Sequence, residues 1–166
     1  DTSFAFIEAA QRRGHENLHC LISDLSVRLG RPLARVRSLT ISNDAKRIAL
    51  GASFEEVELL DVDAVFIRKD PPFDQAYLYA TLLLEHARGG PVIINDPRGL
   101  RDTNEKLYAM NFPEWTPRTL VSSDREAIRR FVTEVGGEGV IKPLDGAGGV
   151  GVMMLRDGDK NARAII

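Results

Sequence analysis

The sequence predicts an α/β protein, with a parallel sheet in residues 1–112 and a second, smaller unit after it. Two observations favour this fold class. Residues 62–67 and 91–94 are short, nearly continuous apolar runs, typical of strands buried on both faces. Residues 74–88, between them, carry apolar side chains at helical spacing. Strand, helix and strand in this order are typical of a parallel sheet.

The remaining elements follow from caps, periodicity and stop signals. Asp, Ser or Thr before an apolar periodic run predicts a helix start, and glycine after it predicts the end. Apolar runs bounded by Gly, Pro or Asp predict strands. Helices are expected at residues 4–13, 75–88, 103–111 and 125–135, and strands at 17–22, 33–41, 62–67, 91–94, 118–121, 139–144 and 152–156.

The two parts of the chain are predicted to meet at residues 113–117. Pro113 and Pro117 bound this segment and end the helix expected at 103–111. Residues 1–112 therefore form the first predicted domain. Residues 113–166 form the second, a strand, helix and strand followed by a glycine-rich loop and another strand.

Composition predicts a soluble globular protein of one or two domains. Of 166 residues, 43% are hydrophobic and 28% charged, and the net charge of −2 favours no nucleic-acid partner. Cys20 is the single cysteine and is expected to be a buried thiol in a reducing compartment. No apolar stretch approaches about 18 residues and no signal-peptide pattern opens the sequence, so a cytoplasmic protein without a membrane span is expected.

Residues 140–151 combine an apolar run, a lysine and a glycine-dense turn, which is how many proteins bind polyphosphates. A Walker A loop is excluded, because Lys142 precedes the glycines and no Ser or Thr follows them. A dinucleotide fingerprint must open a helix, whereas residues 152–156 are predicted to be a strand. A glycine hairpin with a lysine on the entering strand is the arrangement of kinases and ATP-grasp ligases; an ordinary flexible hairpin is the alternative.

A charged turn follows the strand expected at residues 62–67. Arg68, Lys69 and Asp70 come directly after it, and two prolines then stiffen the chain. Ligands gather at the carboxyl ends of strands in α/β sheets, so Arg68 is predicted to bind a substrate carboxylate. The alternative is a solvated strand end whose charges pair with neighbours.

A second polar segment follows the strand expected at residues 91–94. Asn104, Glu105 and Lys106 lie in the first turn of the helix expected at 103–111. A lysine is unfavourable near a helix N-terminus unless an anion lies beside it, which makes Lys106 a candidate phosphate ligand. An exposed lysine without a ligand is the alternative.

Met153 and Met154 are expected to fill gaps in the core, although one of them could line an adenine pocket, because the glycine loop is close.

Together these segments resemble the prokaryotic glutathione synthetase family of ATP-grasp ligases. The strings Arg-Lys-Asp-Pro-Pro-Phe-Asp and Leu-Arg-Asp-x-Asn-Glu-Lys-Leu are the most specific, and the resemblance spans nearly the whole chain. The matching stretches are residues 1–5, 67–74, 95–107, 116–121 and 141–149.

The resemblance implies a pre-ATP-grasp, Rossmann-like domain at residues 1–112 and the beginning of an ATP-grasp domain at 113–166. It implies ligation of γ-glutamylcysteine to glycine through an acyl phosphate, with ATP and Mg²⁺ (Mn²⁺ can replace it), in a cytoplasmic homo-oligomer. ATP contacts are implied for Lys106, Lys142, Asp145, Gly146, Gly148, Gly149 and Gly151, and substrate binding is assigned to Arg68, Asp70 and Asn104. No catalytic residue and no metal ligand is assigned.

The sequence departs from the family pattern in two ways. Ala147 stands where methionine is expected between the loop glycines, which leaves the backbone role intact. The family's first strand and most of its ATP-grasp domain are missing, so the 166 residues are expected to be a fragment without ligase activity of its own. Another ATP-grasp carboxylate–amine ligase, or a nucleotide-binding or peptide-binding module without catalysis, remains as an alternative.

Overall fold

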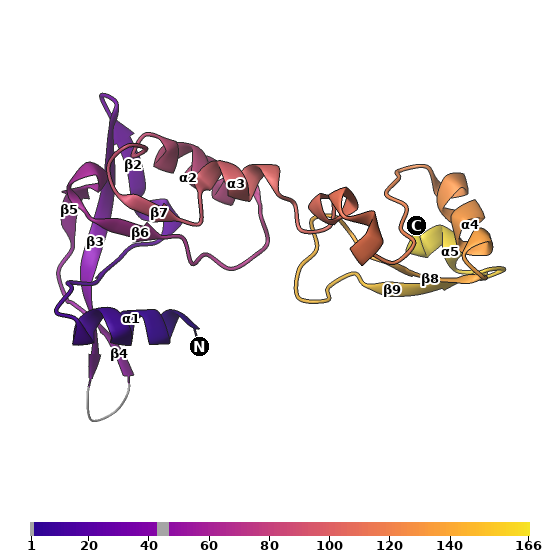
Figure 1. Ribbon diagram of the computed structural model, residues 1–166, viewed down its shortest axis with the longest axis horizontal. Coiled ribbons are helices and arrows are strands. Elements are labelled where there is room, and N and C mark those ends of the chain that lie inside the picture. Colours follow the sequence, from indigo (N-terminus) through magenta and orange to yellow (C-terminus); the bar gives the residue numbers. More distant parts are fainter. Residues whose placement is uncertain (1, 43–46) are drawn as a thin grey trace. The chain divides into compact units, whose positions relative to one another are not determined.

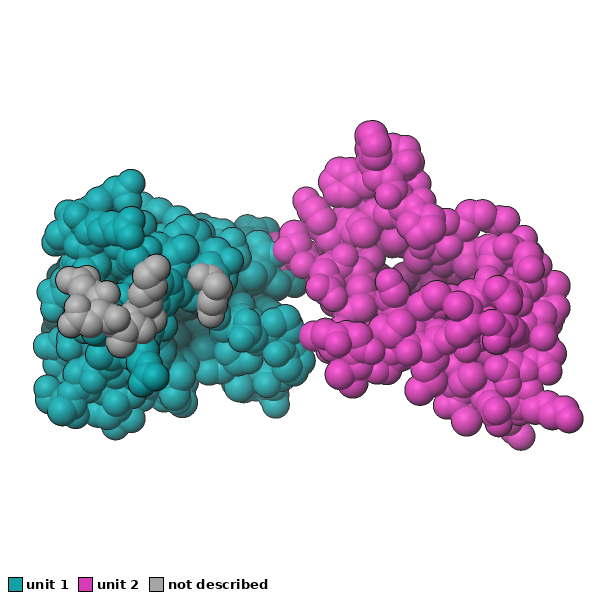
Figure 2. All heavy atoms as spheres, turned by 90° about the horizontal axis from the view of Figure 1, so that it is seen from below, with its two compact units in different colours: residues 1–101 teal, residues 102–166 magenta. Residues whose placement is uncertain are grey.

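The computed structural model describes residues 2–42 and 47–166 and is mixed α/β. It divides into two compact units, residues 1–101 and residues 102–166 (Figures 1 and 2). This division lies N-terminal to the domain boundary predicted at 112/113, which stays a prediction. The described strands form a five-stranded sheet and a two-stranded sheet in the first unit and a two-stranded sheet in the second, and each unit has its own cluster of buried residues.

The first unit is built around one long strand, β3 (Arg31–Ser42). Its described partners all run antiparallel to it: β1 (Leu18–His19), β2 (Leu25–Arg28), β4 (Arg47–Leu50) and β5 (Glu55–Glu58). Apolar and charged side chains alternate along much of β3, as expected when one face of a sheet packs on a core. The strand predicted at residues 33–41 is confirmed and extends further at its start.

The predicted strand–helix–strand segment is present in the same unit. Strands β6 (Ala64–Phe66) and β7 (Val92–Ile94) pair in parallel, and helix α2 (Gln75–Glu85) connects them. The Asp74 carboxylate caps α2 by accepting a 2.8 Å hydrogen bond from the Tyr77 amide, as the sequence predicts.

The core of the first unit lies between β3 and α2. Ala34 and Val36 of β3 are buried with Leu84 and Ala87, which lie three residues apart at the end of α2 and just beyond it. Leu59 completes the cluster. Burial of every second residue holds within each half of β3, at Ala34 and Val36 and again at Leu39 and Ile41, and the buried positions shift by one residue between the two halves.

The Gln11 side chain joins the first helix to β3 by hydrogen bonds. Helix α1 (Thr2–Arg12) begins earlier than residue 4, where the sequence predicts its start. Gln11 donates a 3.0 Å hydrogen bond to the Ile41 carbonyl and accepts one of 2.7 Å from the Ile41 amide. One amide side chain thus satisfies both backbone groups of a strand residue. No described helix is both long and apolar enough to cross a membrane.

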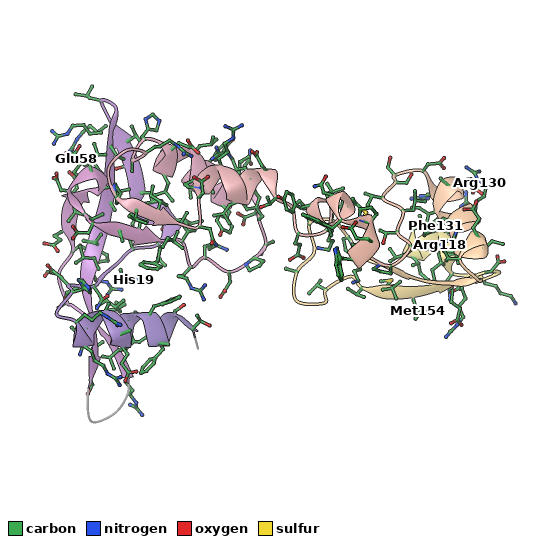
Figure 3. All side chains as sticks on the ribbon, viewed as in Figure 1. His19, Glu58, Arg118, Arg130, Phe131 and Met154 are labelled. Atoms are coloured by element: carbon green, nitrogen blue, oxygen red, sulfur yellow. The ribbon has the colours of Figure 1, made fainter. Side chains whose placement is uncertain are left out.

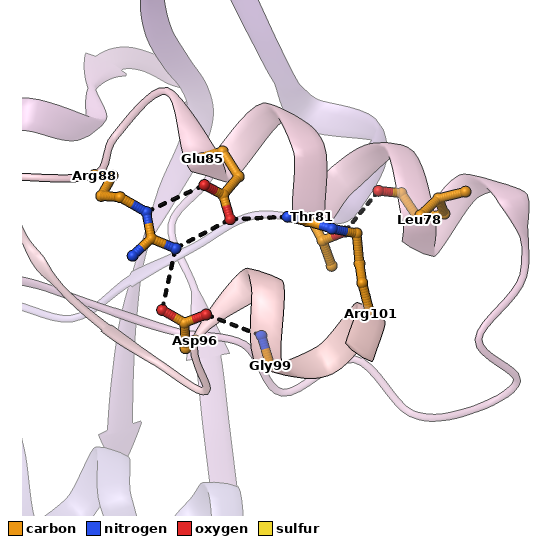
Figure 4. A network of polar contacts seen from close by, with 7 residues as sticks. All are labelled: Leu78, Thr81, Glu85, Arg88, Asp96, Gly99 and Arg101. Atoms are coloured by element: carbon orange, nitrogen blue, oxygen red, sulfur yellow. Dashed lines mark hydrogen bonds and ion pairs between the residues drawn. The ribbon is translucent and has the colours of Figure 1, made fainter. Parts of the chain in front are cut away.

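A polar network joins the end of α2 to the turn after β7 (Figure 4). Glu85 accepts hydrogen bonds from Arg88, at 3.1 Å, and from Arg101, at 2.9 Å. Arg88 also pairs with Asp96 at 3.2 Å, and Asp96 accepts from the Gly99 amide at 2.9 Å. The two arginines lower the pKa of the Glu85 carboxyl, Arg88 most strongly. The network holds helix α3 (Pro97–Asp102) against α2.

The second unit is a two-stranded hairpin covered on one face by helices. Strands β8 (Glu138–Ile141) and β9 (Met153–Arg156) are antiparallel, and α4 (Arg125–Glu134) and α5 (Ala162–Ile165) lie on the same side of them (Figure 1). Leu155 of β9 is buried with Val132 of α4 and Ala162 of α5. As predicted, Asp124 caps α4, accepting hydrogen bonds from the Glu126 and Ala127 amides.

Two predicted elements are wrong. The helix expected at residues 103–111 is replaced by α3, a turn and the 3₁₀ helix Tyr108–Asn111, because Asp96 and Pro97 already supply the cap and first residue of a helix that ends at Asp102. Residues 118–121 are not a strand, because they pair with no described strand and the sheet of this unit contains only β8 and β9. The other described 3₁₀ helices are Ile22–Asp24, Leu59–Asp61 and Pro113–Trp115.

Candidate functional site

The glycine-rich segment joins two antiparallel strands, as the sequence predicts. Ile141, the last residue of β8, lies opposite Met153, the first residue of β9. A dinucleotide fingerprint would open a helix instead, so the strand β9 excludes that class. We call the connecting residues 142–152 the glycine loop.

Glycine is required in this loop by both conformation and space. Gly148, Gly149 and Gly151 have positive φ values, with +73° at Gly151. A Cβ on Gly151 would lie 2.7 Å from the Pro143 Cγ, and one on Gly146 would lie 2.9 Å from the Val150 carbonyl oxygen. The loop therefore doubles back on Pro143 more closely than any residue with a side chain allows.

The side chain of Lys106 reaches across to this loop within the second unit. Its Nζ donates a 2.7 Å hydrogen bond to the Gly146 carbonyl and a 3.4 Å one to the Leu144 carbonyl. The Asn104 amide donates to the same Leu144 carbonyl at 3.3 Å. Two residues about 40 positions away in sequence thus hold the first half of the glycine loop.

Asn104 also shapes the turn that presents Lys106. Its side-chain oxygen accepts hydrogen bonds from the Lys106 amide at 3.0 Å and the Leu107 amide at 3.1 Å. This local pairing closes a turn without a helix, as asparagine side chains commonly do. The prediction that Lys106 lies in the first turn of an α-helix is therefore wrong, and the Asn104 turn, not a helix N-terminus, presents Lys106 to the glycine loop.

Glu105 lies beside the ammonium group of Lys106. The Glu105 carboxylate is 2.9 Å from the Lys106 Nζ; its side chain is 71% exposed, whereas that of Lys106 is 20% exposed. The Lys106 hydrogen bond is the main cause that lowers the pKa of Glu105, and the charge of Lys142 lowers it further. Lys142, which is exposed, directly follows β8. Lys106, Lys142 and the Glu105 carboxylate are therefore close enough to interact electrostatically at the start of the glycine loop.

The outer face of the hairpin carries exposed apolar side chains next to this cluster. Val140 and Met154 face each other across the strands and are 54% and 47% exposed. Met154 points away from α4 and α5 (Figure 3). Met153 is also 47% exposed, so the prediction that both methionines fill the core is wrong. Leu155 takes the core position instead. Met154 lies on the opposite face because strand side chains alternate between faces, whereas Met153 shares the face of Leu155 but lies at the end of β9 that adjoins the glycine loop.

The residues assigned to substrate binding fall in both units. Asn104 belongs to the second unit, while Arg68 and Asp70 belong to the first. Arg68 is exposed and donates a 3.1 Å hydrogen bond to the Ser3 hydroxyl, and its guanidinium lies 6.0 Å from the centre of the Phe6 ring. Asp70 faces Tyr77, whose pKa is raised by burial and, to a smaller extent, by the Asp70 charge. The substrate roles of these three residues stay predictions.

Sequence reasoning missed Glu105 and the docking of the loop on Asn104 and Lys106. The signal available in the sequence was the adjacency of Asn104, Glu105 and Lys106; the contact with residues 144–146 becomes visible only in the folded chain. Among residues 2–42 and 47–166, no three or more His, Cys, Asp or Glu side chains lie close enough together to hold a metal ion.

An α/β unit followed by a glycine hairpin with lysines at its base is the arrangement of ATP-grasp proteins. Two family models match the chain. The model described as "Prokaryotic glutathione synthetase, N-terminal domain" matches residues 1–101, and the one described as "Prokaryotic glutathione synthetase, ATP-grasp domain" matches residues 105–166. The chain belongs to the prokaryotic glutathione synthetase family.

Curated relatives agree with this assignment. The chain is 42% identical to a glutathione synthetase of Yersinia pestis, over 100% of the chain and 52% of the relative. It is 41% identical to those of Salmonella typhimurium and Vibrio cholerae, over 99% and 100% of the chain and 52% of each relative. The chain therefore spans about half the length of the curated relatives it matches.

Proposed function

We propose that the chain is part of a glutathione synthetase, an enzyme that joins γ-glutamylcysteine to glycine with ATP. The observation that carries the proposal is the pair Lys106 and Lys142 at the base of the glycine loop, in a chain that belongs to this family. Cationic side chains and closely approaching backbone amides are the groups that bind polyphosphates.

The proposed reaction has two steps. A carboxylate oxygen of the dipeptide attacks the γ-phosphorus of ATP, and ADP leaves, which gives an acyl phosphate. The glycine amine then attacks the acyl carbon, and phosphate leaves as the amide forms and the amine loses a proton. Phosphorylation is needed because a carboxylate is a poor electrophile without a leaving group.

Lys106 and Lys142 are proposed to offset the charge that develops on the phosphoryl oxygens during the first step. Asp145, Gly146, Gly148, Gly149 and Gly151 are proposed to form the part of the loop that closes over the phosphates and keeps water from the acyl phosphate. Mg²⁺ would accompany ATP as a counter-ion. The described residues contain no group of three or more His, Cys, Asp or Glu side chains that could hold the ion.

The first unit is proposed to bind the dipeptide and to contain a parallel, Rossmann-like sheet. The parallel pair β6 and β7 with its crossover helix α2 supports the sheet, and the position of Arg68 just beyond β6 supports a carboxylate contact. Asp70 and Asn104 complete the proposed substrate residues. A cytoplasmic homo-oligomer is part of the proposal by resemblance to the family.

Replacing Gly151 with alanine is expected to raise the KM for ATP about tenfold, because the new Cβ must move away from Pro143 and the residue must keep a positive φ. Gly158→Ala is the matched control. Gly158 has a φ of +75°, but an added Cβ would meet nothing within 4 Å, and Gly158 lies beyond the loop. Steady-state kinetics of the intact enzyme measure both variants. Equal KM values for the two variants would contradict a special role of the loop.

Transfer of labelled oxygen tests the proposed chemistry in the intact enzyme. Both oxygens of the γ-glutamylcysteine carboxylate that becomes joined to glycine are labelled with ¹⁸O. Mass spectrometry should then find one ¹⁸O in each phosphate released, and one glutathione should form for each phosphate. Phosphate without ¹⁸O would rule out the acyl phosphate. No product with this dipeptide, despite ATP binding, would favour another ATP-grasp carboxylate–amine ligase.

A further inference from the structure

All three protons of the Lys106 ammonium already have acceptors. An ammonium group donates at most three hydrogen bonds. The acceptors are the Gly146 carbonyl at 2.7 Å, the Glu105 carboxylate at 2.9 Å and the Leu144 carbonyl at 3.4 Å. A phosphate oxygen can therefore bind Lys106 only if one of these three acceptors leaves.

The three acceptors differ in how easily they can leave. The two carbonyls belong to the backbone of the glycine loop, and Leu144 is held a second time by Asn104. Releasing either carbonyl requires the loop to move. The Glu105 side chain is 71% exposed and reaches Lys106 from the adjacent residue. It can rotate into water without moving the backbone, and an ionised carboxylate is well solvated there.

We propose that Glu105 is a displaceable counter-ion that holds the phosphate position on Lys106 until ATP takes its place. The carboxylate presents to the ammonium group the same kind of anionic oxygen that a phosphate presents. It also lies close enough to Lys142 for that lysine to act on its charge. Glu105 thereby keeps the lysine extended toward the loop in the empty site, at the expense of affinity for ATP. This inference rests on the proposed nucleotide site.

Removing this charge should strengthen ATP binding. Glu105→Gln is expected to lower the dissociation constant of Mg-ATP about two- to fivefold at low salt, the range for an exposed ion pair. At high salt the gain in affinity for Mg-ATP should be smaller, because salt screens the interaction between exposed charges. The KM for ATP should fall in step with the dissociation constant. Isothermal titration calorimetry of the intact enzyme, without dipeptide, measures the dissociation constant.

Glu138→Gln is the matched control for charge. Glu138 is 62% exposed and pairs with Arg156 at 2.7 Å, at the end of the hairpin away from the glycine loop. This variant removes the same charge and should leave the ATP affinity unchanged. A double-mutant cycle isolates the contact with Lys106, because Glu105→Gln should have a smaller effect on ATP binding once Lys106 is alanine, with only the interaction with Lys142 left to remove. Glu105→Ala gives a second variant without the carboxylate.

The outcomes separate this inference from the proposed function. If the wild-type enzyme binds no Mg-ATP, the proposed nucleotide site fails, and the inference fails with it. If the wild type binds Mg-ATP but Glu105→Gln and Glu105→Ala bind it equally well or more weakly, only the inference is overturned. Tighter binding in both variants, with a smaller gain in the Lys106→Ala background, would establish it, and an undiminished gain in that background would overturn it.

Discussion

Replacing Lys142 with alanine in the intact enzyme is expected to lower kcat/KM for ATP at least a hundredfold. The lysine directly follows β8 at the base of the glycine loop and is proposed to face the transferred phosphoryl group. A single donor to developing charge in a water-excluded site typically contributes about a hundredfold to a thousandfold in rate. Because Lys142 is exposed, its loss should not destabilise the fold. Steady-state kinetics with thermal unfolding of the same samples check both parts.

Lys160→Ala serves as the control for loss of one lysine. Lys160 is exposed in the same unit but lies beyond β9, outside the glycine loop. Its variant should retain wild-type kinetics. Equal activity of Lys142→Ala and wild type would remove Lys142 from the proposed site. Equal losses in the two lysine variants would point to overall charge instead of a defined contact.

Leu155→Ala is expected to destabilise the second unit by about 3 kcal/mol, within the range measured for leucine truncations in protein cores. Leu155 is 1% exposed and is buried with Val132 and Ala162, so its removal leaves a cavity lined by both helices. Denaturant unfolding followed by circular dichroism measures the loss as a lower midpoint at unchanged slope.

The neighbouring residue on β9 provides a control of similar size. Met154 is 47% exposed on the other face of the hairpin, and Met154→Ala should cost less than about 1 kcal/mol. A Leu155→Ala variant as stable as Met154→Ala would mean that the hairpin packs on α4 and α5 through its other face.

Local signals predicted much of the fold. The Asp74 and Asp124 caps are confirmed because a carboxylate three residues before a free backbone amide acts within its own turn. The glycine loop was predictable for a similar reason, since β8 and β9 are adjacent in sequence and pair with each other. Asp96 and Pro97 are an equally local signal, and they start α3 at residue 97, ahead of the helix expected at residues 103–111.

Features set by distant partners could not be predicted in the same way. The antiparallel pairing of β3 with four other strands depends on which edges meet, which the apolar pattern of residues 33–41 does not specify. The docking of Lys106 on the Gly146 carbonyl is another example, because it joins segments 40 residues apart. The sequence therefore identifies the lysine and the loop as candidates but not their contact, and the place of Glu105 beside Lys106 in the chain does not by itself show that the two side chains pair.

The most direct test of the central claim is ADP release by the intact enzyme with Mg-ATP and γ-glutamylcysteine, with and without glycine. We predict sustained ADP release that depends on glycine and matches glutathione formed mole for mole, because glycine attacks the activated dipeptide in the proposed second step. ADP release that is the same without glycine, or ATP binding without turnover, would contradict the proposal that this chain is part of an ATP-dependent glutathione ligase.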